Sequence, residues 1–225
     1  LKMLLMCLLA GSGFRVATAA ELLPRLRRPV GLAFTQNHQR LLVANSRGQS
    51  LSLIDIAQQK TIAEESSGGV LSDLQPLDDG GWMLATDESN HQLLLLSVKN
   101  DQVQVQQRVL VSPYPVRVVV DQQQEFCYVT SLWSKRVTRL RLNKTADSWQ
   151  ATVRQAIDMP FTPRELLVLP GESRLVVADS FGGNLALLDT ATPATGRLRL
   201  LGVRQFPGHN VRGLGLSANG KMLLV

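Results

Sequence analysis

Three arginines in this chain recur at one place in a repeated pattern, and cations that recur in this way can form an anion-binding site. Arg117, Arg164 and Arg212 each precede a short apolar run, and His209 lies just before the third of them. A guanidinium group binds carboxylates and phosphates through a planar fork of N–H donors. If the fold gathers these arginines, they would focus a positive potential and favour an anionic small ligand or an acidic protein surface. The alternative is that each arginine is solvated or pairs with a nearby acid, as Arg164 could with Asp179.

Other residues that could carry chemistry are sparse. The sequence contains no His-Glu-x-x-His, no Cys-x-x-Cys, no glycine-rich phosphate loop and no Gly-x-Ser-x-Gly. The histidines, His38, His91 and His209, lie far apart without the spacing of metal ligands, and His38 and His91 are expected to be solvated in polar turns. We therefore predict no catalytic residue and no metal site in these residues. Whether the protein is an enzyme stays open at this stage.

The charge of the chain does not indicate a nucleic-acid partner. There are 24 Lys and Arg residues against 18 Asp and Glu, a formal net charge of +6. The basic residues are mostly single among Leu and Val, and the tight cluster is Arg25, Arg27 and Arg28. A nucleic-acid surface would more often show a continuous basic stripe interleaved with aromatic residues. We expect a solvated basic surface and no nucleic-acid binding.

The elements that would position the arginines repeat along the chain. An apolar run, a polar turn and a second, alternating run recur four times with a period of about 40–50 residues, which is typical of β-propeller blades. The first runs are 41–46, 82–87, 127–131 and 175–180, and the alternating runs are 50–55, 92–97, 136–142 and 184–189. A β-sandwich is the alternative, but it does not require one four-strand unit repeated in register. The predicted fold class is therefore all-β, a β-propeller of four-stranded blades in which each strand packs one face.

The same repeat sets the expected blade boundaries. We predict blades at 29–70, 71–112, 113–160 and 161–208, with the start of a fifth at 209–225. Residues 213–225 match residues 31–43 without a gap, so the sequence ends inside an expected strand. We expect residues 20–225 to form about four and a half blades of a partial propeller, an open arc truncated at the C-terminus.

Blade geometry places the three arginines. In a four-stranded blade, the loop that enters the innermost strand and the loop that joins the second strand to the third emerge on one face of the ring. Arg117, Arg164 and Arg212 begin innermost strands, so we predict that they and His209 form a ligand-binding site at the channel mouth.

The first 19 residues have the pattern of a secretory signal peptide. Lys2 precedes a short apolar run, and Ala17-Thr18-Ala19 predicts cleavage before Ala20. The run is too short to span a bilayer as a helix. A lipoprotein signal at Cys7 is the alternative, but Met6 is not the small residue that such a site requires. We expect a periplasmic or secreted protein with no membrane span after cleavage.

Removal of residues 1–19 would leave one cysteine, Cys127, which therefore cannot form an internal disulfide bond. It lies in an apolar run, so a buried and unreactive thiol is expected.

Several runs of residues resemble those of a known family of repeat proteins. Residues 40–45 followed by 50–55 resemble the YVTN-type bacterial propeller repeat, in which one strand ends Val-Ala/Thr-Asn and the next ends Val-Ile-Asp. The resemblance covers residues 29–225 and implies fold more than function, because such propellers serve as binding platforms, lactonases and dehydrogenase subunits. Residues 131–134, 160–165 and 209–214 are similar to exported propellers fused to a downstream c-type cytochrome or di-haem peroxidase-like module. This similarity implies haem c beyond residue 225 and no cofactor within it.

Three functions remain as alternatives. The favoured one is a non-catalytic exported propeller that acts as a ligand- or protein-binding platform. The second is the propeller domain of a periplasmic c-type cytochrome or peroxidase-like electron-transfer protein. The third is a lactonase-like enzyme, which would need acidic or histidine side chains to converge on the channel.

Overall fold

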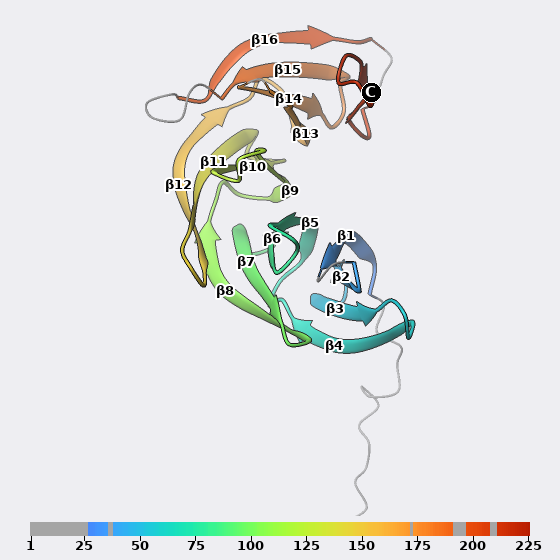
Figure 1. Ribbon diagram of the computed structural model, residues 1–225. Helices are drawn as coiled ribbons and strands as arrows, with labels where there is room; N and C mark the ends of the chain where they lie inside the picture. Colours follow the sequence, from blue (N-terminus) through green and yellow to red (C-terminus); the bar gives the residue numbers. More distant parts are fainter. Residues whose placement is uncertain (1–26, 36–37, 172, 191–196, 208–210) are drawn as a thin grey trace, which may run out of the picture.

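The computed structural model describes residues 27–35, 38–171, 173–190, 197–207 and 211–225. These residues form four antiparallel sheets of four strands each and one two-stranded sheet. The four larger sheets follow one another around an open arc, with the innermost strands on its concave side and the outermost strands on its convex side (Figure 1). The predicted fold class, an all-β open arc of four-stranded blades, is confirmed.

Each blade is a meander, in which strands adjacent in sequence pair side by side. Blade 1 contains β1 (Pro29–Thr35), β2 (Arg40–Asn45), β3 (Ser50–Asp55) and β4 (Lys60–Ser66). Blade 2 contains β5 (Leu71–Leu77), β6 (Trp82–Asp87), β7 (Gln92–Lys99) and β8 (Gln102–Leu110). Blade 3 contains β9 (Pro115–Val120), β10 (Phe126–Ser131), β11 (Arg136–Lys144) and β12 (Trp149–Asp158). Blade 4 contains β13 (Pro163–Leu169), β14 (Arg174–Asp179), β15 (Asn184–Asp189) and β16 (Arg199–Gln205), and the small sheet pairs β17 (Gly215–Leu216) with β18 (Leu223–Leu224).

Tight turns make these meanders possible. Asn100 and Asp101 both have positive φ angles, 52° and 58°, and connect β7 to β8 as a two-residue hairpin. Asn and Asp tolerate this left-handed conformation, and its twist matches that of the flanking strands. Gly80, with φ 88°, plays a similar part between β5 and β6.

The hydrophobic core lies between blades rather than within them. One cluster joins blades 1 and 2, a second joins blades 2 and 3, and a third joins blades 3 and 4. In β7, Leu94 and Leu96 pack toward blade 1, whereas Leu93 and Leu95 pack toward blade 3. Each inner blade is therefore a layer held between two neighbours.

This layering corrects one expectation. The alternating pattern predicted a single packed face for each strand, yet β6 and β10 are buried along their whole length. Because neighbouring blades cover both faces of the middle strands, apolar residues on both faces are buried. The alternation is present on outer strands such as β8, where exposed side chains alternate with buried or half-buried ones.

Within the described part of the chain, no blade covers one face of β1. Ala33 and Thr35 are buried toward blade 2, whereas Leu32 and Phe34 point the other way and are exposed. Among the described residues, no helix has the length and hydropathy needed to cross a membrane.

Candidate functional site

A β-bulge at the start of each innermost strand fixes which residue leads that strand. The register shifts at Val30, Ser72, Val116 and Arg164, each of which is skipped in the pairing with the second strand. The next residues are Gly31, Asp73, Arg117 and Glu165, which pair with Ala44, Thr86, Thr130 and Ala178. Four successive blades therefore place glycine, aspartate, arginine and glutamate at one equivalent position.

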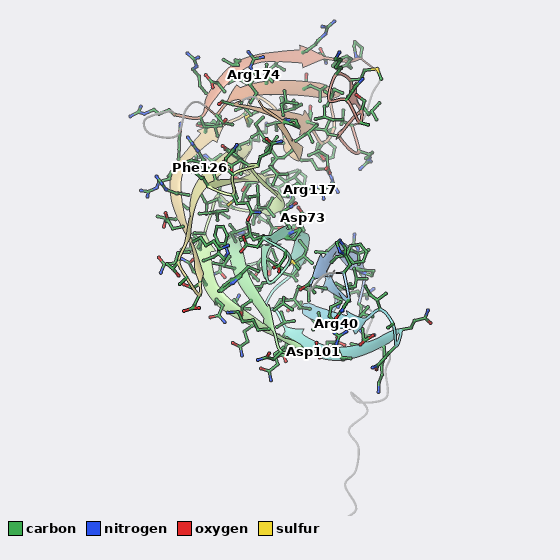
Figure 2. The ribbon with its side chains drawn as sticks, viewed as in Figure 1. Arg40, Asp73, Asp101, Arg117, Phe126 and Arg174 are labelled. Atoms are coloured by element: carbon green, nitrogen blue, oxygen red, sulfur yellow. The ribbon has the colours of Figure 1, made fainter. Side chains whose placement is uncertain are left out.

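Three of these residues form a linked ion cluster. Arg117 Nη1 lies 3.1 Å from Asp73 Oδ1, and Arg117 Nε donates to Glu165 Oε2 at 2.9 Å. Arg117 Nη2 also pairs with Glu165 Oε2. The second Asp73 oxygen accepts the backbone N–H of Val118 at 2.9 Å. The cluster thus connects blades 2, 3 and 4, and Figure 2 shows Asp73 and Arg117 beside each other on the concave side of the arc.

The two carboxylates of this cluster are buried, unlike those of a surface ion pair. The side chains of Asp73 and Glu165 are 8% and 9% exposed, whereas that of Arg117 is 36% exposed. Burial, the largest single influence, acts to lower the pKa of Arg117, but the carboxylates of Asp73 and Glu165 together raise it above its ordinary value. Arg117 therefore stays charged, and its charge is compensated within the protein.

The cluster lines a pocket on the channel side of the arc. The pocket has a volume of about 320 Å³, within the range of small-molecule sites. Its walls are Val30, Gly31, Leu32, Asp73, Leu74, Gln75, Arg117, Val118, Val119, Glu165, Leu166 and Leu214. Two carboxylates face one guanidinium there, so these three groups carry a net negative charge.

Arg117 and Arg164, predicted to lie at equivalent places in their blades, occupy different positions. Arg117 lines the pocket. Arg164 occupies the bulge one residue earlier, and its Nε lies 3.8 Å from Glu165 Oε1. Arg212 is exposed next to buried Val211, and His209 lies outside the described residues.

Asp179, the possible partner of Arg164, has another role. Its carboxylate accepts the backbone N–H groups of Phe181 and Gly182 at 3.1 and 3.0 Å and the side-chain amide of Asn184 at 2.6 Å. It therefore caps the turn between β14 and β15, as short Asp side chains commonly do.

Sequence reasoning missed Asp73 and Glu165. A signal was available, because each is a single acid placed directly before an apolar run, as Arg117 is a single base. The same bulge occurs in all four blades, and Arg164 occupies the skipped position that Val116 occupies in blade 3. Arg164 and Arg117 therefore do not occupy equivalent positions.

Backbone hydrogen bonds show that the segments entering the first strands and the loops joining the second strands to the third lie on one face of the arc, called here the loop face. In each blade, the segment that enters the first strand accepts a hydrogen bond from the loop that joins the second and third strands. The pairs are Ser46 N–H to Arg28 O at 3.0 Å, Glu88 to Val70 at 2.8 Å, Leu132 to Tyr114 at 2.9 Å and Ser180 to Thr162 at 2.8 Å. The expected grouping of these loops is therefore present.

Exposed aromatic side chains gather on the loop face. Trp133 and Phe181 lie in the joining loops of blades 3 and 4, are 58% and 62% exposed, and have ring centroids 6.1 Å apart at an interplanar angle of 29°. Tyr114, in the segment that enters blade 3, is also exposed and lies 4.8 Å from the His91 ring. His91, expected to be solvated, is half-buried by this contact.

Basic side chains are also exposed on the loop face. Its exposed basic residues include Arg28, Arg47, Lys135, Arg164 and Arg212. Two acids of this region form ion pairs, Glu64 with Arg27 and Asp158 with Arg136, the latter at 2.7 Å, whereas Glu88 and Asp179 accept hydrogen bonds from neutral groups of their own blades.

Metal and thiol chemistry receive no support from the described residues. Across 27–35, 38–171, 173–190, 197–207 and 211–225, no group of three or more His, Cys, Asp or Glu is placed to hold a metal ion. Cys127 is buried, as expected, and burial raises the pKa of its thiol far above the ordinary value. A thiol in this state is a poor nucleophile.

Comparison with known proteins supports the architecture. No family model and no curated protein sequence matches the chain. Among solved structures, Kuenenia stuttgartiensis hydrazine synthase is similar with a TM-score of 0.70 at 15% identity, over 95% of this chain and 58% of that one. A putative 6-phosphogluconolactonase from Bacteroides uniformis is similar with a TM-score of 0.72 at 18% identity, over 87% of this chain and 62% of that one.

A third structure, the periplasmic gluconolactonase of Pseudomonas aeruginosa, is similar with a TM-score of 0.71 at 18% identity, over 87% of this chain and 62% of that one. The fold is that of a β-propeller. At these identities the similarity establishes the fold of the propeller and not its activity. The chain spans about three-fifths of the length of these structures.

Proposed function

We propose that this propeller is a non-catalytic binding platform that takes an acidic protein surface on its loop face. The observation that carries the proposal is the joint presence there of exposed aromatic rings and exposed basic side chains. Aromatic and arginine residues are enriched in the centres of protein interfaces, and complementary charge around them steers the partner into place.

The channel pocket supports a protein surface over a small anion as the partner. Arg117, the cation inside the pocket, is already paired with Asp73 and Glu165. A small anion in the pocket would meet these two carboxylates and would have to displace one of them from Arg117. An acidic surface laid over the loop face would instead meet Lys135 and Arg164.

Charge reversal tests this proposal. Binding of the 225-residue chain to immobilised poly-L-glutamate is measured at increasing salt, with poly-L-lysine as the control polymer. Lys135→Glu and Arg164→Glu should each weaken binding by about three- to tenfold, because an attraction of up to about 1 kcal/mol becomes a repulsion.

Lys60 is the matched control for this test. It is exposed at the start of β4, on the opposite face of the arc from the loop face. Lys60→Glu should leave binding unchanged. Equal losses in all three variants would mean that net charge alone attracts the polymer, and the proposal would then be wrong.

A second candidate is lactone hydrolysis in the channel pocket. Two carboxylates beside a guanidinium could activate a water molecule and stabilise an oxyanion, and two of the similar structures bear lactonase names. Acid release from glucono-δ-lactone measures this activity. Hydrolysis that is lost in Glu165→Gln and kept in Lys135→Glu would make the lactonase the function.

Export and haem association are separate proposals. The signal-like residues 1–19 lie outside the described residues, and N-terminal sequencing of the secreted protein should begin at or near Ala20. The YVTN-type relationship and the link to a c-type cytochrome rest on the sequence runs given above. Haem staining of the protein isolated from its host tests that link.

A further inference from the structure

We propose that the stacked pair of Trp133 and Phe181 is the anchor of the loop face, and that it takes an apolar side chain from an acidic segment of a protein partner. This inference rests on the proposed function and goes further, because it names the contact point and the chemistry of the bound segment. The segment would lie across the joining loops of blades 3 and 4, with its acids toward the basic side chains beside the rings.

The first support is the equivalent position of the two rings. Each is the second residue after the buried polar residue that ends the second strand of its blade, Ser131 for Trp133 and Asp179 for Phe181. The blade repeat therefore brings side chains 48 positions apart into contact, with centroids 6.1 Å apart. Blade 3, which carries Trp133, has a four-stranded blade on each side, whereas blade 4, which carries Phe181, is followed among the described residues by the two-stranded sheet of β17 and β18.

The second support is that both loops are held rigidly before any partner binds. In blade 3, Leu132 N–H donates to Tyr114 O at 2.9 Å, and Ser134 Oγ donates to Pro113 O at 2.9 Å. In blade 4, the Asp179 carboxylate accepts three hydrogen bonds from its own turn. Rings fixed in advance lose little conformational entropy on binding, which is a property of interface anchors.

The third support is the charge beside the rings, which selects the occupant. Lys135 is exposed two residues after Trp133, and Arg164 is exposed in the bulge of the next blade. A neutral sugar could also stack on exposed rings, but it would not use these cations. An apolar side chain flanked by Asp or Glu uses both the rings and the cations.

Trp133 provides a selective reporter for the experiment. The other two tryptophans, Trp82 and Trp149, are buried. Quenching of the 225-residue chain's fluorescence by acrylamide should therefore report mainly on Trp133. The probe is a synthetic peptide with one leucine flanked by glutamates, and the controls are the same peptide with alanine for leucine and one with lysines for glutamates.

We expect the leucine–glutamate peptide to protect Trp133 from acrylamide and to bind at least about threefold more tightly than its alanine counterpart. Phe181→Ala should abolish that preference for leucine, whereas the exposed Tyr114→Ala should change it less. A third variant, Trp133→Phe, keeps an aromatic ring and should retain peptide binding while losing the signal, which separates the ring's role from the reporter's.

Three results would overturn the inference, and only some of them would also overturn the proposed function. If both acidic peptides bind equally and Trp133 stays open to acrylamide, the platform stands but the anchor does not. If soluble cello-oligosaccharides protect Trp133 and the acidic peptides do not, the rings are a sugar platform. If no acidic probe binds and Lys135→Glu changes nothing, the proposed function fails together with the inference.

Discussion

Removal of Arg117 should destabilise the propeller far more than removal of its sequence neighbour in the repeat, Arg164. Arg117→Met keeps most of the aliphatic volume but leaves the carboxylates of Asp73 and Glu165, both less than one-tenth exposed, without their cation. Deleting one partner of a buried ion pair costs about 3–5 kcal/mol, whereas exposed pairs contribute about 0–1 kcal/mol.

The expected loss lies between these limits because Arg117 itself is 36% exposed and water screens part of the interaction. We expect Arg117→Met to lower the free energy of unfolding by about 2–4 kcal/mol. With a urea m-value of about 2 kcal/mol/M, the midpoint of unfolding should fall by about 1–2 M. Tryptophan fluorescence follows the transition, because Trp82 and Trp149 are buried in the core between blades 2 and 3.

Two further variants make the test specific. Arg164→Met should cost less than about 1 kcal/mol, because that side chain is exposed and its contact with Glu165 is 3.8 Å long. Combining Arg117→Met with Asp73→Asn and Glu165→Gln should recover much of the loss, since no buried charge is then left unpaired. If Arg117→Met unfolds at the wild-type urea concentration, the cluster does not hold the blades together and our reasoning is refuted.

Three other outcomes are expected. Burial raises the pKa of the Cys127 thiol above its ordinary value of 9.0, so the folded thiol keeps its proton where the unfolded thiol ionises. Stability should therefore fall as the pH rises above about 9, and urea titrations should show a smaller fall in Cys127→Ala. Gly80→Ala should lower the free energy of unfolding in urea by about 2 kcal/mol or more, because Gly80 has φ 88° and a Cβ there would lie 2.5 Å from Phe34 O. Gly171→Ala is the control and should lower it clearly less, because Gly171 has φ 71° but open space around it. Replacing the exposed Leu32 and Phe34 by lysine should reduce binding of a hydrophobic dye and self-association, and an unchanged signal would mean that the uncovered face of β1 is not the adhesive surface.

The blade pattern could be predicted from the sequence because its causes are local. Side chains alternate along a strand, turn residues interrupt the strands, and the unit repeats about every 40–50 residues. The run Leu93–Leu96 marked a strand without showing that both faces are covered. Burial of both faces depends on the neighbouring blades, so it could not be predicted from the residues of a single strand.

The candidate site could be predicted only in part for a similar reason. The face was predicted from the meander, and Arg117 was among the residues named for it. All four blades have the same bulge; Arg164 occupies its skipped position and Arg117 the position after it, and this assignment depends on strand pairing rather than on residue type. The grouping of arginines therefore failed to anticipate the carboxylates that surround Arg117.

The sequence by itself determined the strands, their turns and the repeat, since these follow from the conformational preferences of residues close together in the chain. The tertiary structure decided which distant side chains meet. Asp73 and Glu165 contact Arg117 from 44 and 48 positions away, and Trp133 contacts Phe181 of the neighbouring blade. Such contacts depend on the angle and register at which whole blades pack. A shift of one residue in a bulge changes the contacts while leaving the strand pattern as it was.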